Sequence, residues 1–329
     1  MFRKSSLYVR AGLGFAALAV ALPSFAADAP PAIDDSVLAT LPQVTVKAAK
    51  RKPALHQKAA SGALGNLAVI DTPFSVKSVG SDEIQARQAG ILSEAVKYDA
   101  SVTSISSSYG THPATLAVRG LPLDDLNGYK VDGMANINRG VEMPLEMFDR
   151  VEVLKGLSGF MYGFGSPGGI VNYVTKRPTD KTTLSVDAGY QSDNLYKEHL
   201  DAGGRFDDPR FGYRVNVVHE EGGAASGEAN VHRTAVGVAL NAQLSDDLSI
   251  DVDTLYQERK TSGGTDIIVS PLYALPKPID GSKRLYSNGS YTDVDYSLST
   301  VSATYKFSPD WQGKLAYRYT DSTRAYTKD

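Results

Sequence analysis

Cysteine is absent from the 329 residues, which excludes disulfide bonds, thiolate metal sites and thiol nucleophiles. An excess of charge of one sign is absent as well, because 34 Lys and Arg stand against 37 Asp and Glu. Nucleic-acid-binding domains usually carry a strongly basic patch, so this balance argues against nucleic acid as a partner. Hydrophobic residues make up 42% of the chain, which excludes a wholly disordered protein.

The first apolar run, residues 11–22, is too short to cross a membrane as a helix, which takes about 20 residues. Basic residues precede it, and Ser24 and Ala26 place small side chains at the positions that a signal peptidase reads. Residues 1–26 are therefore expected to be a signal peptide, removed after export. Since no second apolar run approaches the required length, the exported chain could enter a membrane only through strands.

Residues 27–66 are rich in Ala, Pro and Lys and lack sustained periodicity, which is typical of a flexible tether. They contain one short alternating segment whose β-branched residues favour extended backbone. Two interpretations of this segment stay open on the residues alone: a strand added to the edge of a partner's sheet, or an ordinary linker. The segment consists of Leu41, Pro42, Gln43, Val44, Thr45 and Val46.

Residues 67–180 mix helical and strand periodicity and predict a small α+β domain. A helix is expected to begin at Ser81, which precedes two acidic residues and suits an N-cap, and to end at Gly90. Short strands bounded by turn residues are expected at residues 74–79, 115–119, 128–131, 150–155 and 170–175.

From residue 181 to residue 329 the hydrophobic pattern has a period of two and predicts seven strands. Tight turns alternate with longer connections, at residues 191–198, 221–230 and 259–296, which are expected to face outward as loops. This pattern favours an outer-membrane β-barrel over a soluble β-sandwich. Seven strands cannot enclose a preceding domain, so they are expected to be the first of about 22 strands in a longer protein.

A set of short motifs is spread along residues 71–178. They are Thr72-Pro73-Phe74-Ser75-Val76, Val118-Arg119-Gly120, Val131-Asp132-Gly133-Met134, Phe148-Asp149-Arg150-Val151-Glu152-Val153-Leu154-Lys155-Gly156, Tyr162-Gly163, Ser166-Pro167-Gly168-Gly169-Ile170-Val171-Asn172 and Thr175-Lys176-Arg177-Pro178. Together these motifs resemble the plug domain of TonB-dependent siderophore receptors, and the resemblance is most specific from Arg150 to Pro178.

The resemblance implies a membrane β protein, with an α+β plug followed by antiparallel barrel strands, and a ferric-siderophore importer of the Gram-negative outer membrane. Implied partners are TonB with ExbB and ExbD, a ferric siderophore and outer-membrane lipid; a monomer without a cofactor is expected. Residues 41–46 then correspond to the TonB box. Arg119 and Lys155 correspond to plug residues that engage barrel carboxylates, although the family usually has Arg at the second position, and Lys cannot form the bidentate pair.

Other motifs are expected to have structural roles. The sequence from Gly163 to Gly168 matches a dinucleotide fingerprint, but a strand follows it where a helix would be needed. The five histidines lack the spacing of a metal site along the chain. No nucleophile elbow or paired carboxylates are apparent, so an enzyme is not expected.

Ligand contacts are expected in two loops of the plug, residues 106–112 and 134–139. Iron held by a siderophore has its coordination filled, so the protein needs aromatic, amide and basic groups rather than metal ligands. The candidates are Tyr109, His112, Asn136, Asn138 and Arg139. Two alternatives stay open: the same architecture importing haem, cobalamin or an oligosaccharide, and a non-transporting envelope β-protein.

Overall fold

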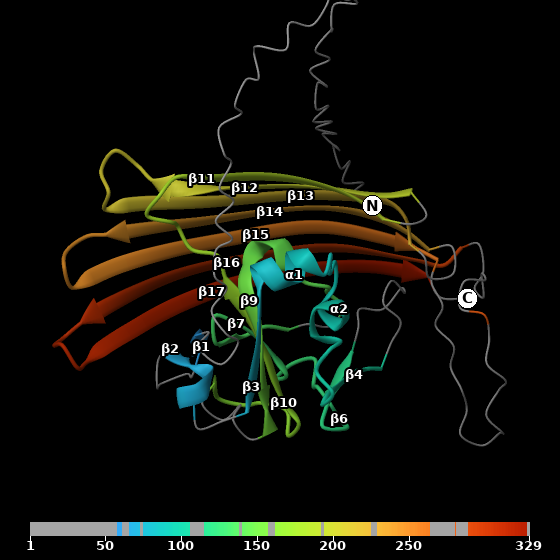
Figure 1. Cartoon of the computed structure of the whole chain (residues 1–329), viewed down its shortest axis with the longest axis horizontal. Coiled ribbons are helices and arrows are strands. Elements are labelled where there is room, and N and C mark those ends of the chain that lie inside the picture. Colours follow the sequence, from blue (N-terminus) through green and yellow to red (C-terminus); the bar gives the residue numbers. More distant parts are fainter. Residues whose placement is uncertain are drawn as a thin grey trace, which may run out of the picture. The chain divides into compact units, whose positions relative to one another are not determined.

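Two principal sheets make up the described part of the chain, one mixed and one antiparallel (Figure 1). The chain divides into two compact units, residues 1–50 and 51–329, and every described residue belongs to the second. The computed structural model describes residues 58–60, 66–72, 75–105, 115–137, 140–156, 162–191, 194–224, 229–263, 280 and 289–327.

The part of the chain before the long antiparallel sheet, the plug, is built around a five-stranded sheet with the order β3-β9-β10-β7-β8, in which only β10 and β7 run parallel. Smaller sheets pair β1 with β2 and place β5 between β4 and β6. Its strands are β1 (Lys58–Ala60), β2 (Asn66–Ala68), β3 (Val76–Gly80), β4 (Val102–Ser104), β5 (Leu116–Val118), β6 (Leu121–Pro122), β7 (Tyr129–Val131), β8 (Met134–Ala135), β9 (Phe148–Lys155) and β10 (Gly169–Thr175). Its helices are η3 (Val69–Asp71), α1 (Ser81–Ala86), α2 (Leu92–Val96) and η4 (Leu145–Met147).

The ends of helix α1 differ from the sequence prediction. Gly80 is the N-cap, so Ser81 is already the first helical residue and its side chain does not cap the helix. The helix ends at Ala86, and Gln88 adopts a left-handed backbone with φ of 52°, so the chain turns before Gly90 is reached. Gln88 therefore adopts the left-handed conformation that was expected at Gly90, although glycine adopts it more easily.

The core of the plug is formed by β9 and β10. Val151, Val153 and Val171 have no exposed surface. The same hydrophobic cluster continues into the barrel strands, where it includes Val218 and Leu298. Plug and barrel strands therefore share one apolar core rather than two separate ones.

Seven antiparallel strands follow the plug, each paired with its neighbours in the sequence. This confirms the predicted plug followed by barrel strands. The strands are β11 (Thr183–Gln191), β12 (Leu195–Arg205), β13 (Phe211–Ala224), β14 (Ala229–Gln243), β15 (Leu248–Ser262), β16 (Tyr291–Lys306) and β17 (Gln312–Thr327). They form the long curved sheet of Figure 1, and the plug lies against its concave side.

Two of the three predicted outward loops are shorter than expected. Strand β12 already begins at Leu195, and β13 continues to Ala224, so residues 191–198 and 221–230 are mostly strand. Only the connection between β15 and β16, residues 263–290, is long. Charged residues occur on both faces near these strand ends, and this hides the period of two. We call this end of the strands the loop end and the opposite end the turn end.

The two faces of the barrel sheet differ in chemistry. Along β13, Val215 and Val217 point away from the plug, whereas Asn216 and Val218 point toward it and are buried. Aromatic side chains gather on the outward side near the turn end, where the ring centroids of Phe206 and Tyr213 lie 5.0 Å apart. This outward apolar belt with aromatic rims is typical of strands that face lipid. Within the described ranges, no helix is long and apolar enough to cross a membrane.

Candidate functional site at the plug and barrel interface

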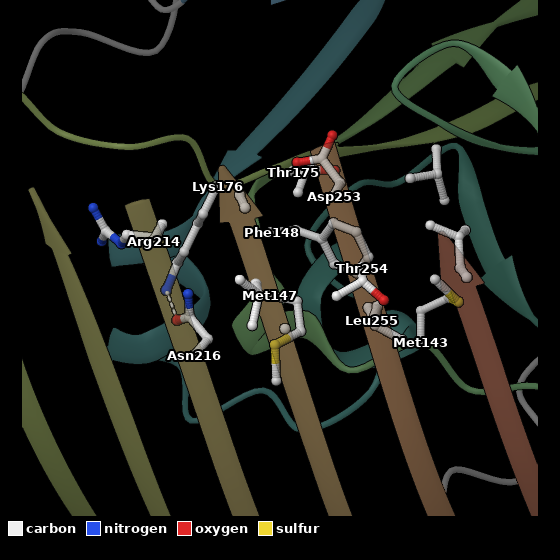
Figure 2. A pocket seen from close by; sticks show the side chains of 15 residues that line it. Met143, Met147, Phe148, Thr175, Lys176, Arg214, Asn216, Asp253, Thr254 and Leu255 are labelled. Carbon is white, nitrogen blue, oxygen red and sulfur yellow. Dashed lines mark hydrogen bonds between the residues drawn. The ribbon is translucent and has the colours of Figure 1, made fainter. Parts of the chain in front are cut away.

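Helix η4 brings the plug into close contact with strand β14. A Cβ atom at Gly237 would lie only 2.6 Å from Sδ of Met147, so any larger residue here would have to displace the methionine side chain. Figure 2 shows Met147 and Phe148 pointing into the small space between plug and strands. This cavity measures about 20 Å³, room for about one water molecule, so the packing here is tight.

A cluster of four charged groups, three of them buried and Lys197 half-buried, joins η4 to three barrel strands. Arg233 of β14 is fully buried and donates to both carboxylate oxygens of Glu146, at 2.9 and 3.0 Å. It also donates to Glu220 of β13 at 2.8 Å, and Lys197 of β12 lies 2.7 Å from Glu146. Burial alone would raise the pKa of Glu146, but Arg233 and Lys197 hold it well below its usual range. Two acids and two bases balance, so no buried charge is left uncompensated.

A second ionic contact is made by Arg177, which follows β10. Its guanidinium donates to both carboxylate oxygens of Asp253 on β15, at 2.6 and 2.7 Å, and lies 3.2 Å from Asp132. Burial would lower the pKa of Arg177, but Asp132 and Asp253 raise it. Asp132 is positioned by a tight turn with Gly133, since both have positive φ, of 50° and 80°. This turn is the structural role of the Val131-Asp132-Gly133-Met134 motif.

A third contact lies beside the second, and Figure 2 shows the part of it that joins Lys176 to Asn216. Lys176 donates to Asp201 of β12 at 2.7 Å and to Asn216 of β13 at 3.1 Å. Arg214 holds the same carboxylate of Asp201 at 2.5 and 2.7 Å. The segment that leaves the plug thus contacts the strands that follow it through consecutive basic residues, at positions 176 and 177.

Neutral hydrogen bonds extend the interface toward β16. Gln257 of β15 donates to the backbone oxygen of Glu142 at 2.8 Å, and the hydroxyl of Tyr296 donates to Oδ1 of Asn136 at 2.6 Å. Asn136 was predicted to contact ligand, but its side chain is only 1% exposed. The structure therefore gives Asn136 a role in holding the plug against β16.

A larger cavity of about 380 Å³ lies between helix α1, η4 and strands β11 to β13. Its wall has polar and apolar surface in similar amounts and includes Gln85 and Asp187, which form a hydrogen bond of 2.7 Å between plug and barrel. His199 and the carboxylate of Glu220 also line it. This side of the interface is looser and more polar than the side seen in Figure 2.

The two basic residues predicted to engage barrel carboxylates differ in their surroundings. Lys155 forms an ion pair with Asp99 of the plug itself, with its Nζ 2.7 and 2.8 Å from the two carboxylate oxygens. Burial would raise the pKa of Asp99, but hydrogen bonds from Lys155 and Ser101 lower it. Arg119 is exposed, has a left-handed backbone, and directs its guanidinium toward Gly156.

Sequence reasoning therefore missed the residues that join plug and barrel here, Glu146, Lys176 and Arg177. Other predicted residues lie outside the described part of the chain: Tyr109, His112, Asn138 and Arg139, and the segment 41–46. The Gly163–Gly168 motif is a structural turn, as expected, because β10 follows it and the oxygen of Phe164 accepts a hydrogen bond from Lys130 at 2.8 Å.

The profile of the TonB-dependent Receptor Plug Domain family matches residues 68–170. The chain carries the plug domain of a TonB-dependent receptor. It contains the plug and the early barrel strands of such a receptor, and its relatives are outer-membrane proteins of Gram-negative bacteria. The family is one of receptors and transporters rather than enzymes.

Three relatives illustrate the similarity. The ferrichrome receptor FcuA of Yersinia enterocolitica is 29% identical over 260 residues, which are 76% of this chain and 33% of the relative. The ferrichrome outer membrane transporter/phage receptor of Escherichia coli is 24% identical over 80% of this chain and 36% of its own length. The crystal structure of BauA, the ferric preacinetobactin receptor from Acinetobacter baumannii, superimposes with a TM-score of 0.77 and 27% identity, covering 84% of this chain and 42% of that one. The chain thus spans about a third of the length of the curated relatives it matches.

Proposed function

We propose that the receptor containing this chain imports a ferric siderophore across the outer membrane, and that energy from TonB moves the plug. The observation that carries the proposal is the separation of the two sheets. The plug strands and the barrel strands belong to different sheets, so only side-chain and packing contacts hold them together in the described ranges. Such a plug can move without breaking strand pairing.

The strength of these contacts explains why outside energy is needed. Glu146, Arg177 and Lys176 each take part in a buried or half-buried ion pair with a barrel strand. Separating such a pair while it is still buried leaves charges without their partners, at a cost of about 3–5 kcal/mol, and several such pairs must open together. A ligand bound outside could hardly supply this alone, which fits a receptor driven by the TonB complex with ExbB and ExbD.

The proposed arrangement assigns a role to each part of the chain. Residues 1–26 are the signal peptide, 27–66 the periplasmic tether with the TonB box at 41–46, 67–180 the plug and 181–329 the first barrel strands. The ligand class is proposed from the names of the relatives, which bind ferrichrome or ferric preacinetobactin. Tyr109, His112, Asn138 and Arg139 remain the proposed plug contacts to ligand, and Arg119 is a further proposed contact to barrel carboxylates.

Uptake of 55Fe tests the function in a strain that lacks its other siderophore receptors. The full receptor is expected to import one class of ferric siderophore, and deletion of TonB should abolish uptake while leaving surface binding intact. Val44→Pro should act like the TonB deletion, because proline removes a backbone donor from the added strand. Val37→Pro, outside the TonB box, is the control. Import of haem or cobalamin in place of a ferric siderophore would contradict the proposed ligand class. Uptake without TonB would contradict the proposed mechanism.

A further inference from the structure

Two histidines and a glutamate come together on the outward face of strands β13 and β14, near the loop end. In the register of this hairpin Glu221 lies opposite His232, and His219 lies two residues before Glu221 on the same face. The rings of His219 and His232 meet edge to face, with centroids 5.3 Å apart. One ligand atom from each of the three residues lies within 4.8 Å of the others.

The spacing along the chain gave no sign of this cluster, because 13 positions separate the histidines at 219 and 232. Hairpin pairing removes that distance: Ala224 pairs with Ala229 at the tip, and the same register brings residues 221 and 232 together. The expectation of no metal site rested on short sequence spacing alone. Residues on paired strands can also lie close enough to share a metal ion, and sequence spacing does not reveal them.

We propose that His219, Glu221 and His232 form a binding site for a divalent transition-metal ion of the zinc class on the outer surface of the barrel. Two imidazoles and one carboxylate suit zinc, nickel or copper, whereas magnesium and calcium favour oxygen ligands. Three protein ligands leave a coordination position open to water or to another ligand. The site is independent of the proposed siderophore uptake.

A neighbouring hydroxyl orients the first histidine. Nδ1 of His219 lies 3.0 Å from Oγ1 of Thr234, its directly paired residue on β14. When Nδ1 carries the proton and donates to Thr234, Nε2 has its lone pair free, and Nε2 faces Oε2 of Glu221 at 3.8 Å. Metal-bound histidines typically have their other ring nitrogen fixed in this way.

The distances require only a small adjustment. Ligands about 2.0–2.2 Å from a tetrahedral zinc lie about 3.4 Å apart, so the 3.8 Å pair is almost in place. The widest separation in the cluster must close by roughly 1.4 Å, which side-chain rotation can provide on an open surface. The backbone positions are already set, because all three residues lie within paired strands.

The surrounding charges favour a cation. Glu198 of β12 is the paired neighbour of His219, and Glu258 of β15 is the paired neighbour of Thr234, both on the outward face. Lys260 is paired with His232, but its ammonium lies 3.8 Å from Asp293 on the far side. Three carboxylates therefore surround the histidines against one neighbouring ammonium group.

The test uses the full receptor in detergent, purified with a tag that contains no histidine and freed of metal by a chelator. Equilibrium dialysis against zinc chloride, with magnesium at millimolar concentration, is expected to show one zinc ion per receptor. His232→Ala and His219→Ala should each weaken binding more than about 100-fold, and Thr234→Val about 10–100-fold, since outer-shell partners have effects of that size. Glu258→Gln, at the same height on the next strand, removes a neighbouring charge but no ligand atom, so it should weaken binding no more than about threefold.

Cobalt substitution supplies a second readout, because a cobalt ion in a site of low coordination number absorbs visible light far more strongly than the free aqua ion. The spectrum of a histidine-bound cobalt ion should be present in the unmodified receptor and lost in His232→Ala, while heat-modifiable electrophoretic mobility shows that the variant is folded. Equal zinc binding by the two histidine variants and the unmodified receptor would overturn the proposal. Loss of binding in Glu258→Gln to the same extent would also overturn it, by assigning the zinc to a diffuse acidic surface.

Discussion

Glu146 shows how one buried side chain of the plug depends on several strands of the barrel. Its carboxylate contacts Arg233 of β14 and Lys197 of β12, and Arg233 reaches on to Glu220 of β13. A buried ion pair adds little net stability by itself, but removing one partner leaves a charge without compensation. The single residue therefore controls a contact that three strands share.

Glu146→Gln is expected to loosen the plug by about 3–5 kcal/mol, because the buried Arg233 and the half-buried Lys197 are then left with one carboxylate, that of Glu220, in place of two. The measurement is the urea concentration at which the plug of the full receptor becomes sensitive to protease. Asp149→Asn is the matched control, since Asp149 is 57% exposed and its ion pair with Arg150 is worth less than about 1 kcal/mol. Equal urea sensitivity of the two variants would contradict the role of Glu146.

The same carboxylate predicts a dependence on pH. The pKa of Glu146 is lowered in the folded protein, so its contribution is present above the unfolded value of about 4.3 and is lost progressively as pH falls below it. Plug release in urea should become easier from about pH 5 downward. In Glu146→Gln the slope of this dependence should be smaller. An identical slope in both proteins would assign the acid sensitivity to other carboxylates.

Gly237 permits the closest approach of plug and barrel, so Gly237→Ala should displace Met147. The expected cost is about 1–3 kcal/mol, typical of overpacking, in the urea measurement used for Glu146. Gly189→Ala on β11 is the control, because its new Cβ would have no contact nearer than 3.9 Å. Adding Met147→Ala should relieve the strain of Gly237→Ala. If Gly237→Ala behaves like Gly189→Ala, the packing of η4 on β14 is not limiting.

At the scale of elements, local sequence patterns predicted the plug strands well but failed at the strand ends of the barrel. The strands β9 and β10 follow from β-branched runs bounded by Gly-rich turns. The ends of β12 and β13 were missed because Lys197 and Glu220 face inward, where the plug supplies partners that no local pattern reveals. The resemblance identified the family, but not which residues meet at the interface.

The interface itself was beyond sequence reasoning for a related reason. Glu146 and Arg233 are 87 positions apart, and nothing in either segment records the register between η4 and β14. Asn136 was predicted to be a polar loop residue available to ligand, but its Oδ1 accepts a hydrogen bond from the hydroxyl of Tyr296. A polar residue in a loop can be buried when another element covers it.

The outward face of β15 permits a direct test of which side meets lipid. Val252→Arg should destabilise the barrel by about 2–4 kcal/mol in lipid vesicles, as arginine does near the middle of a membrane. Glu258→Arg is the control, because it lies on the same face about 20 Å nearer the loop end, beyond the apolar belt. The measurement is urea unfolding followed by tryptophan fluorescence. Equal effects of the two variants would contradict the assigned belt.

At the scale of the whole molecule, one set of features holds the plug in place and another leaves it able to move. The plug shares a hydrophobic core with the inner face of the sheet, yet its strands pair only among themselves in the described ranges. The tight side at η4 and the looser cavity of about 380 Å³ at α1 give the interface two different characters. We expect the tight side to hold the plug at rest and to open when TonB acts.

The absence of cysteine from these 329 residues permits that movement to be blocked by a single engineered bond. A Cβ atom at Gly237 would lie 3.7 Å from Cβ of Met147, within the range of disulfide bonds. The double variant Met147→Cys, Gly237→Cys can therefore join η4 to β14 in the full receptor. The two single variants serve as controls.

The decisive measurement is uptake of 55Fe-siderophore by cells carrying the oxidised double variant, with disulfide formation verified by mass spectrometry. We expect surface binding to be retained and uptake to fall to the level of a TonB deletion. A reductant should restore uptake, and both single variants should transport under all conditions. Undiminished uptake by the fully oxidised double variant would show that transport does not require η4 to leave β14, and would contradict the proposed movement of the plug.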